Sequence, residues 1–234
     1  MVLKIILCIL FGYLVGNINP SYIIGRLRGF DIRKKGSGNA GASNAVITMG
    51  KGVGVASAIF DILKATAVYL LAPLMFGDLA LAAELAGAAC IIGHIFPVVM
   101  KFRGGKGLAC LGGVMLGMDW RFFLIALAAE ICLVLLVDYI CIAPITASIL
   151  TPLCYVWFGA DYLDWLMFAE NGWIGAAVLG VASLVILSRH VQNIRRIVTG
   201  TEMHFSYLWS KDKEAELDRV RRNTEIAEAK KKKQ

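Results

Sequence analysis

Apolar segments of bilayer length recur along most of this chain, and they limit its fold more than any other feature. The first covers residues 2–24, and about 20 apolar residues are enough for a helix to cross the hydrocarbon core of a membrane. It has neither a basic leading segment nor an A-x-A cleavage site, so we expect a membrane helix and not a signal peptide. Hydrophobic residues make up 58% of the chain, against roughly 45–50% in an ordinary soluble domain. The sequence therefore predicts an all-α integral membrane protein.

Seven membrane helices are predicted, one for each apolar segment. The segments are residues 2–24, 53–76, 79–100, 108–118, 122–137, 140–158 and 173–187. Segment 108–118 is short for a crossing, so the alternative is six crossings with one re-entrant segment.

The bundle is predicted to form one membrane domain, residues 1–210, followed by a basic cytoplasmic tail, residues 211–234. Lysine and arginine gather in residues 26–51, 101–107 and 189–234, and loops rich in these residues stay in the cytoplasm. We therefore expect these loops to share the cytoplasmic side, with the N-terminus outside and the C-terminus inside.

The formal net charge of +7 favours anionic partners, such as lipid headgroups or anionic substrates. Nucleic acid is not expected as a partner, because the sequence has no basic helix with interleaved aromatic residues. The six cysteines all lie in apolar segments and form no C-x-x-C pair. They are expected to pack as small residues and not to form disulfides, and neither a metal nor a cofactor is predicted.

A cationic, glycine-rich loop, residues 101–107, separates two apolar segments. Its cations are Lys101, Arg103 and Lys106, and its glycines are Gly104, Gly105 and Gly107. Glycines let backbone N–H groups approach an anion, and the helix that follows would point its positive N-terminal end at the same place. The loop is predicted to bind a phosphate, and the alternative is a turn whose cations only hold it in the cytoplasm.

A second loop, residues 36–44, gathers small, hydroxyl and amide side chains between two membrane helices. Its candidate binding residues are Ser37, Gly38, Asn39, Gly41, Ser43 and Asn44. Glycines permit positive φ, and successive N–H groups in such a turn can form an anion-binding nest. The alternative is a flexible linker.

The segment after the last apolar run carries His190, Asn193 and Arg196 at i, i+3 spacing. If the helix continues into this segment, these side chains share one face where the chain leaves the membrane, and they would bind or orient a phosphate or a hydroxyl. The alternative is a surface helix whose arginines reach toward lipid headgroups.

Charged residues inside apolar segments are expensive and need partners. Asp61 and Lys64 are i, i+3 neighbours and are predicted to pair inside the bundle, where they are also a functional candidate. Glu84 and Glu130 have no partner that the sequence identifies.

Three motifs on the predicted cytoplasmic side, in this order, resemble the acyl-phosphate-dependent glycerol-3-phosphate acyltransferases, the PlsY family. They are residues 36–44, residues 101–107 with the preceding His94-x-Phe96-Pro97-Val98, and His190-x-x-Asn193 with Gly200-Thr201-Glu202. The resemblance implies a seven-helix enzyme of the bacterial cell membrane that transfers a fatty acyl group from acyl phosphate to the sn-1 hydroxyl of glycerol 3-phosphate. Lysophosphatidate and phosphate are then the products, in the first step of phospholipid synthesis.

The resemblance also implies roles for single residues. The glycine motif around Lys106 would hold glycerol 3-phosphate, while Ser37, His190 and Asn193 would line the reacting centre and Glu202 would belong to the same site. No acyl-enzyme is required, because acyl phosphate is already activated, so orientation and charge stabilisation can supply the rate. In the mechanism proposed for the family, the substrate phosphate takes the hydroxyl proton.

The sequence departs from the family pattern at several positions. Ile47 stands where the family has an arginine, Ala40 where proline is common, and Asp138-Tyr139-Ile140-Cys141 where Arg-Tyr-Val-Ser is more usual. Either Lys51 or Lys64 supplies the missing charge as a substrate-binding residue, or the chain is a divergent paralogue of low activity.

Three other classes of protein fit the sequence less well. A soluble-donor acyltransferase needs His-x4-Asp, which none of the three histidines provides, and a P-loop enzyme needs G-x-x-x-x-G-K-[ST], which is absent. A transporter of phosphorylated metabolites would place its charged site near the membrane midplane, often in repeated halves. No repeat is visible, and only the Asp61–Lys64 pair favours that alternative.

Overall fold

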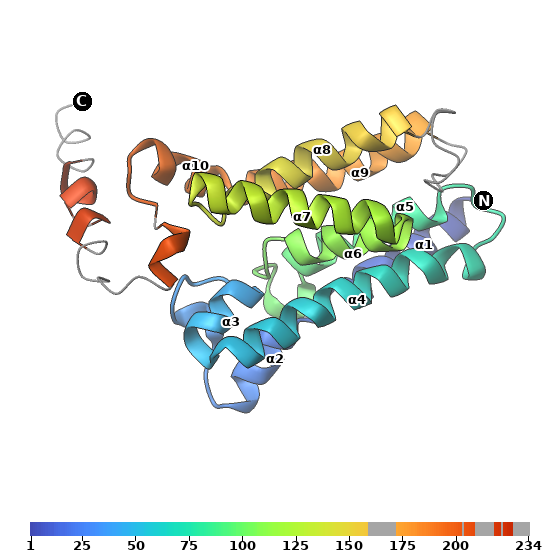
Figure 1. The fold of residues 1–234 in the computed structure, drawn as a ribbon. Coiled ribbons are helices and arrows are strands. Elements are labelled where there is room, and N and C mark those ends of the chain that lie inside the picture. Colours follow the sequence, from blue (N-terminus) through green and yellow to red (C-terminus); the bar gives the residue numbers. More distant parts are fainter. Residues whose placement is uncertain (159–171, 203, 209–217, 221, 227–234) are drawn as a thin grey trace, which may run out of the picture.

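The computed structural model describes residues 1–158, 172–202, 204–208, 218–220 and 222–226, and its helices pack side by side in one bundle (Figure 1). The α-helices are α1 (Val2–Gly16), α2 (Pro20–Leu27), α3 (Ala42–Met49), α4 (Lys51–Met75), α5 (Ala82–Ile95), α6 (Leu108–Met118), α7 (Trp120–Val137), α8 (Ile142–Phe158), α9 (Gly172–Ser188) and α10 (Val191–Val198). The 3-10 helices are η1 (Ile32–Lys34), η2 (Val98–Met100) and η3 (Phe205–Leu208). These residues contain no strand, so the all-α fold is confirmed.

Each of the seven predicted apolar segments contains a helix. Three are long and apolar enough to cross a membrane, namely α4, α5 continued through η2, and α7. Two bent pairs, α1 with α2 and α9 with α10, raise the number to five if each pair is one span. Helix α6 and most of α8 are apolar but shorter. The predicted number of seven crossings is therefore not confirmed.

The first apolar segment is predicted to be one membrane helix. The structure instead has two helices, α1 and α2, which meet at 43°. Asn19 caps α2 by accepting the N–H of Tyr22 at 2.8 Å. Pro20 follows at the first helical position, which needs no N–H donor. The side chain of Asn17 accepts the N–H of Val98 at 2.7 Å, which joins this break to η2. Specific hydrogen bonds therefore stabilise the break between α1 and α2.

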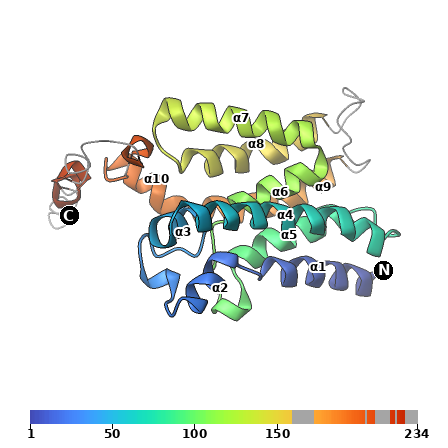
Figure 2. The ribbon, with the colours of Figure 1, turned by 60° about the horizontal axis from the view of Figure 1, so that its bottom comes forward.

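The polar segment 26–51 is predicted to be a loop. The structure shows that it also contains a helix, α3. Gly50 separates α3 from α4 with a φ of +97°, a conformation that glycine adopts readily and other residues rarely do. Together α2, α3 and α10 lie at the end of the bundle away from the N-terminus (Figures 1 and 2). The Lys4–Asp78 ion pair lies at the opposite end and joins α1 to the turn after α4. The loops that carry the predicted motifs therefore share one end of the bundle.

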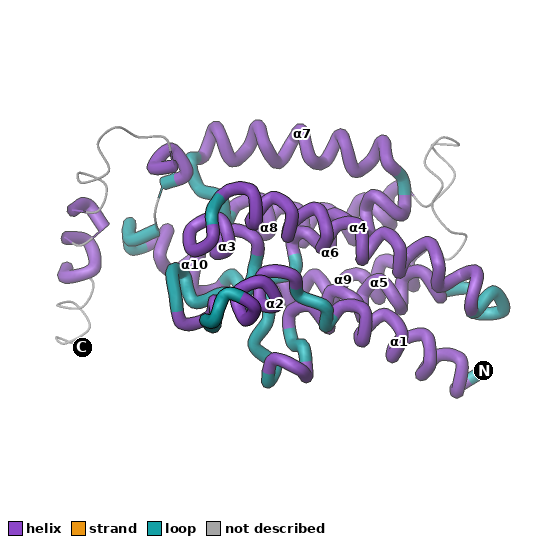
Figure 3. The backbone as a smooth tube through the Cα atoms, turned by 90° about the horizontal axis from the view of Figure 1, so that it is seen from below, coloured by secondary structure: helices purple, strands orange, loops and turns teal. Residues whose placement is uncertain are grey.

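Glycines bring α1 and α5 into backbone contact (Figure 3). A Cβ on Gly12 would overlap the backbone of Ala86, and a Cβ on Gly16 would overlap that of Cys90. Small residues spaced four apart are the usual means by which membrane helices approach closely. This contact holds α5, which leads into the glycine-rich loop.

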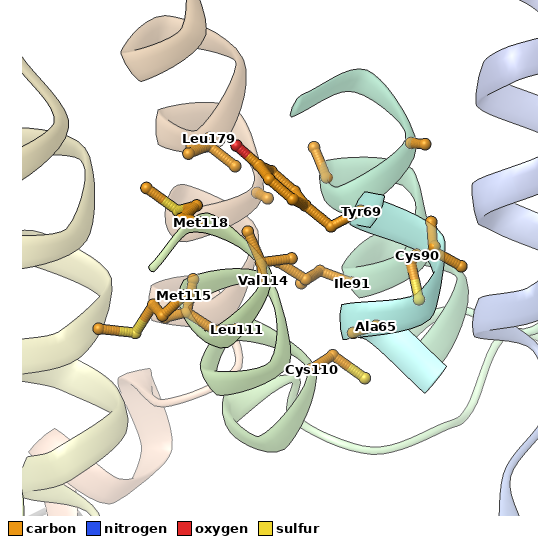
Figure 4. Packing of buried hydrophobic residues seen from close by; sticks show 14 of the residues in the cluster. Ala65, Tyr69, Cys90, Ile91, Cys110, Leu111, Val114, Met115, Met118 and Leu179 are labelled. Atoms are coloured by element: carbon orange, nitrogen blue, oxygen red, sulfur yellow. The ribbon is translucent and has the colours of Figure 1, made fainter. Parts of the chain in front are cut away.

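The core between α4, α5, α6 and α9 is apolar, and Figure 4 shows Tyr69, Ile91, Val114 and Leu179 converging there. Glu84, whose partner the sequence did not identify, accepts hydrogen bonds from Tyr155 at 2.6 Å and from Tyr69 at 3.2 Å.

Glu130 in α7 likewise has a partner, because Thr146 of α8 donates to its carboxylate at 2.7 Å. The cysteines among the described residues are all free thiols, and four of the six are buried, as expected of packing residues.

Candidate active site

A chain of polar side chains joins two of the three predicted motifs. The ammonium of Lys106 donates to Oδ1 of Asn193 at 2.7 Å, and Nδ2 of Asn193 donates to Glu202 at 2.8 Å. These two bonds fix the orientation of the Asn193 amide. The second carboxylate oxygen of Glu202 is buried without a protein partner. The structure thus brings together residues from α10, the glycine-rich loop and the Gly200-Thr201-Glu202 motif.

His190 lies next to these hydrogen-bonded side chains, at the start of α10. There the polypeptide bends by 49° as it leaves α9. His190 is the N-cap of α10 and the helix does not run unbroken from α9. The condition attached to the predicted common face of His190, Asn193 and Arg196, a helix that continues from the last apolar segment, is therefore not met. Nδ1 of His190 lies 2.9 Å from the carbonyl oxygen of Ile186. Because a carbonyl oxygen can only accept a hydrogen bond, Nδ1 carries the proton and donates it. Burial lowers the pKa of His190 to about 4. At neutral pH the ring is therefore uncharged, and Nε2 carries the lone pair.

The His190 environment predicts a pH dependence of stability. The pKa of a histidine in an unfolded chain is about 6.5, above the value of about 4 in the folded protein. The stabilisation from a neutral His190 is therefore complete above about pH 6.5 and is lost as the pH falls toward about 4. The Tm of His190→Gln, measured in detergent across this range, should fall less than that of the natural protein. Identical curves would contradict the assignment.

Most amides of the glycine-rich loop are not available to the phosphate that this loop is predicted to bind. The N–H groups of residues 101–105 all donate to backbone carbonyls, among them those of His94, Ile95 and Pro97. Gly104 and Gly105 are buried against His94 and Pro97, which occupy the space that a Cβ would need. The absence of a Cβ here serves packing within the protein. Lys106 and the first turn of α6, whose N–H groups have no partner within the helix, remain to meet an anion.

Burial lowers the pKa of Lys106 from its ordinary value, while the carboxylate of Glu202 acts in the opposite direction. Lys101 is exposed at the start of the loop with a φ of +54°. Among the predicted loop cations in the described part of the chain, Lys106 is the one whose side chain is hydrogen-bonded to the third motif.

The first predicted loop is organised by Asn44. Its Nδ2 donates to the carbonyls of Ile32, Lys35 and Asn39 at 2.7–3.0 Å, and its Oδ1 accepts the N–H of Ser37 at 2.8 Å. Asn44 is fully buried. The structure gives it the role of a loop hub instead of the predicted substrate contact.

The remaining candidates of this loop differ in exposure. Ser37, Gly38 and Ser43 are exposed and Asn39 is half-buried, while Gly41 caps α3. The hydrogen bonds of the described residues link Ser37 to Asn44 and not to the Lys106 chain. Ser37 therefore shares an end of the bundle with that chain without being joined to it.

Arg33 connects the first loop to the second, a role the sequence did not reveal. Its guanidinium donates to the carbonyl of Met100 at 2.6 Å and pairs with Asp31 at 2.7 Å. The hydrogen bond from Arg33 holds the pKa of Asp31 at about 2. In the sequence, an arginine in a basic loop indicates only that the loop lies in the cytoplasm. Its structural role becomes visible only in the three-dimensional contacts.

Lys51 and Lys64 are the two cations expected to supply the charge of the family arginine that Ile47 replaces. They lie in different environments. Lys51 is exposed at the start of α4, and Ile47 is 64% exposed on α3. Lys64 is buried and donates to Asp61 at 2.6 Å, which confirms the predicted pair. Because protein acceptors surround its ammonium, Lys64 does not fit the predicted direct contact with substrate.

The turn that departs from the family pattern contacts the segment that follows the third motif. The carboxylate of Asp138 accepts from the N–H and the hydroxyl of Ser206, each at 2.7 Å. The Cys141 thiol in the same turn is buried. Arg219 donates to the carbonyls of Gly200 and Glu202, each at 2.7 Å. Glu202 is therefore held by Asn193 at its side chain and by Arg219 at its backbone carbonyl.

Asp61, His94 and Cys110 form a buried group of potential metal ligands, with their ligand atoms within 4.8 Å of one another. The ammonium of Lys64 lies 2.6 Å from the carboxylate of Asp61 and 3.2 Å from Nδ1 of His94. A cation thus already occupies this group, and a metal ion would compete with it. We assign no metal to these residues.

Comparison with known proteins places this chain among characterised sequences. Residues 6–200 match the family model described as glycerol-3-phosphate acyltransferase. The glycerol-3-phosphate acyltransferase of Lactiplantibacillus plantarum is 35% identical over 216 residues, covering 91% of this chain and 99% of that protein. The corresponding protein of Mesorhizobium japonicum is 34% identical over 199 residues, covering 85% and 94%.

A solved structure is similar over the same range. It is the crystal structure of PlsY (YgiH), an integral membrane glycerol 3-phosphate acyltransferase, in its glycerol 3-phosphate form, with a TM-score of 0.74, 32% identity and coverage of 87% of this chain and 96% of that one. The lysophosphatidic acid form gives a TM-score of 0.73. The chain therefore belongs to the glycerol-3-phosphate acyltransferase (PlsY) family of integral membrane proteins.

Proposed function

We propose that this acyltransferase moves a fatty acyl group from acyl phosphate to the sn-1 hydroxyl of glycerol 3-phosphate. The hydroxyl oxygen attacks the acyl carbonyl carbon, the bond from that carbon to the phosphate oxygen breaks, and the released phosphate takes the hydroxyl proton. Lysophosphatidate and inorganic phosphate are the products. The related PlsY structures with glycerol 3-phosphate and lysophosphatidic acid support the acceptor and the product.

The observation that carries the proposal is the Lys106–Asn193–Glu202 chain beside a neutral His190. A lysine ammonium is a strong phosphate partner, and an imidazole with a free Nε2 accepts a hydrogen bond from a hydroxyl. We assign the phosphate of glycerol 3-phosphate to Lys106 and its hydroxyl to His190. In the same proposal, Asn193 orients the site, while Ser37 and the exposed part of its loop meet the acyl phosphate.

A test of this proposal measures phosphate release by the purified protein in detergent. Release is expected only when acyl phosphate and glycerol 3-phosphate are both present, with one lysophosphatidate formed per phosphate. Glycerol is the matched control acceptor, because it keeps the hydroxyls and lacks the phosphate. Release that does not depend on the acceptor, or equal rates with glycerol, would contradict the proposal. Uptake of glycerol 3-phosphate into vesicles without acylation would favour the transporter alternative.

We also propose that the protein lies in the bacterial cell membrane with its N-terminus outside and the motif loops in the cytoplasm. Cation-rich loops support this orientation. Cysteines introduced at Ser37, Lys106 and Ser188, in a background without reactive native thiols, should be labelled only after the membrane is opened. Labelling of any one of them from outside would exclude a shared cytoplasmic site.

The isoleucine at position 47 leads to a gain-of-function prediction. If this exposed position faces a substrate phosphate, Ile47→Arg should raise kcat/KM by about tenfold, since a charge-assisted contact contributes about 1.5–3 kcal/mol. The same change should partly restore Lys51→Ala if Lys51 now supplies the charge. Steady-state kinetics for both substrates measure the effect. No change in either background would remove position 47 from the proposed site.

A further inference from the structure

We propose that Asp61, Lys64 and His94 are positioning residues that hold the glycine-rich loop, residues 101–107, and with it Lys106, in the geometry that receives the phosphate of glycerol 3-phosphate. The inference rests on the proposed function of Lys106. It concerns buried side chains of α4 and α5, of which His94 contacts the loop directly.

Lys64 joins α4 to the junction between α1 and α2. Its ammonium donates to Asp61 at 2.6 Å, to the carbonyl of Ile18 at 2.5 Å and to that of Gly16 at 3.3 Å. An ammonium has three N–H donors, so these acceptors satisfy it. Lys64 is 7% and Asp61 1% exposed, and a buried ion pair keeps its geometry only while both partners are present. The pair therefore makes a fixed internal support.

His94 carries this support to the loop. Its Nδ1 lies 3.2 Å from Nζ of Lys64 and 3.4 Å from Oδ1 of Asp61. On the other side of the ring, Nε2 lies where a Cβ on Gly105 would be. The carbonyl of His94 also accepts the N–H of Gly105 at 3.0 Å. The imidazole and the loop backbone are thus in direct contact, and the missing Cβ of Gly105 makes that contact possible.

The contact adjoins the phosphate-binding candidate itself. Lys106 follows Gly105 directly and reaches Asn193. On its other side, Gly107 has a φ of +95°, and a Cβ there would press on the side chains of Ile95 and Ile186. Because the backbone is held on both sides of Lys106, a shift at Gly105 moves the ammonium. Productive binding depends on such positions within about 1 Å, so the support should govern the KM for glycerol 3-phosphate more than kcat.

A double-mutant cycle between His94 and Gly105 tests the inference. In the natural background Gly105→Ala should raise the KM for glycerol 3-phosphate by about tenfold, because the methyl group displaces the imidazole. In a His94→Ala background the methyl group enters vacated space, so Gly105→Ala should add less than about threefold. Effects that multiply independently would overturn the inference, because Gly105 would then matter for ligand approach alone. An inactive natural protein would instead overturn the proposed function.

A second comparison separates positioning from general stability. Lys64→Met and Glu84→Gln each remove one charged group from a buried polar cluster, but the partners of Glu84 are Tyr69 and Tyr155, far in sequence from the loop. Both variants should lower Tm. Only Lys64→Met should raise the KM for glycerol 3-phosphate, by about tenfold, and reduce the rise in Tm that this ligand produces. Equal KM values in the two variants would overturn the inference.

Discussion

Lys106→Met is expected to lower kcat/KM for glycerol 3-phosphate by about 100-fold, because a charge-assisted contact with phosphate contributes about 1.5–3 kcal/mol. The change also leaves Oδ1 of Asn193 without its donor, which loosens the orientation of an amide that Glu202 holds from the other side. Initial rates at varied glycerol 3-phosphate measure the effect. The loss should fall mainly on KM if the ammonium binds phosphate equally in the ground and transition states.

Lys34→Met is the matched control, since it removes an exposed cation at the same end of the bundle. General attraction of an anionic substrate to a basic surface would be reduced by both changes. A local contact would be lost only in Lys106→Met, with Lys34→Met within about threefold of the natural protein. Similar losses in the two variants would assign the effect to surface charge.

Each predicted apolar segment contains a helix, although the number of membrane crossings is not confirmed. In lipid a helix satisfies its own backbone hydrogen bonds, so a long apolar segment has no other local option. The apolar segments did not predict the junction at Asn17 and Asn19, where two polar residues sit inside an apolar run. Asn19-Pro20 is a helix-start signal in itself. The length of an apolar run alone does not show where a helix breaks within it.

The chemistry of the glycine-rich loop could be predicted only in part. The family motifs correctly grouped Lys106, Asn193 and Glu202, which lie far apart in the sequence. A glycine in a sequence shows that a Cβ is absent and not what fills the space. At Gly105 the space is filled by the ring of His94, eleven residues earlier. A glycine that makes room for a ligand and a glycine that makes room for a neighbouring side chain look the same in the sequence.

Asn44 illustrates the same limit for polar side chains. An amide in a loop between membrane helices predicts either a ligand contact or a local hub, and the choice depends on the carbonyls within reach. Three backbone carbonyls and one N–H saturate this amide, so it holds the loop that presents Ser37. Only the folded backbone shows that these acceptors converge.

His190→Ala is expected to lower kcat by about 100-fold, within the range that a positioned hydrogen-bonding or proton-transferring group contributes. In the proposed mechanism the departing phosphate takes the proton, so the imidazole needs only to accept a hydrogen bond from the attacking hydroxyl through Nε2. Glutamine offers a carbonyl acceptor on a side chain of similar length. His190→Gln should therefore retain kcat within about tenfold of the natural protein, well above the alanine variant.

The pair of variants distinguishes the two roles open to a neutral histidine. If His190→Gln is as slow as His190→Ala, the imidazole itself takes the proton, and the phosphate is not the base. If His190→Ala keeps full kcat, Nε2 does not meet the substrate at all. The Nδ1 bond to Ile186 makes the comparison sharp, because it fixes which nitrogen carries the hydrogen and so leaves a single acceptor atom for the hydroxyl.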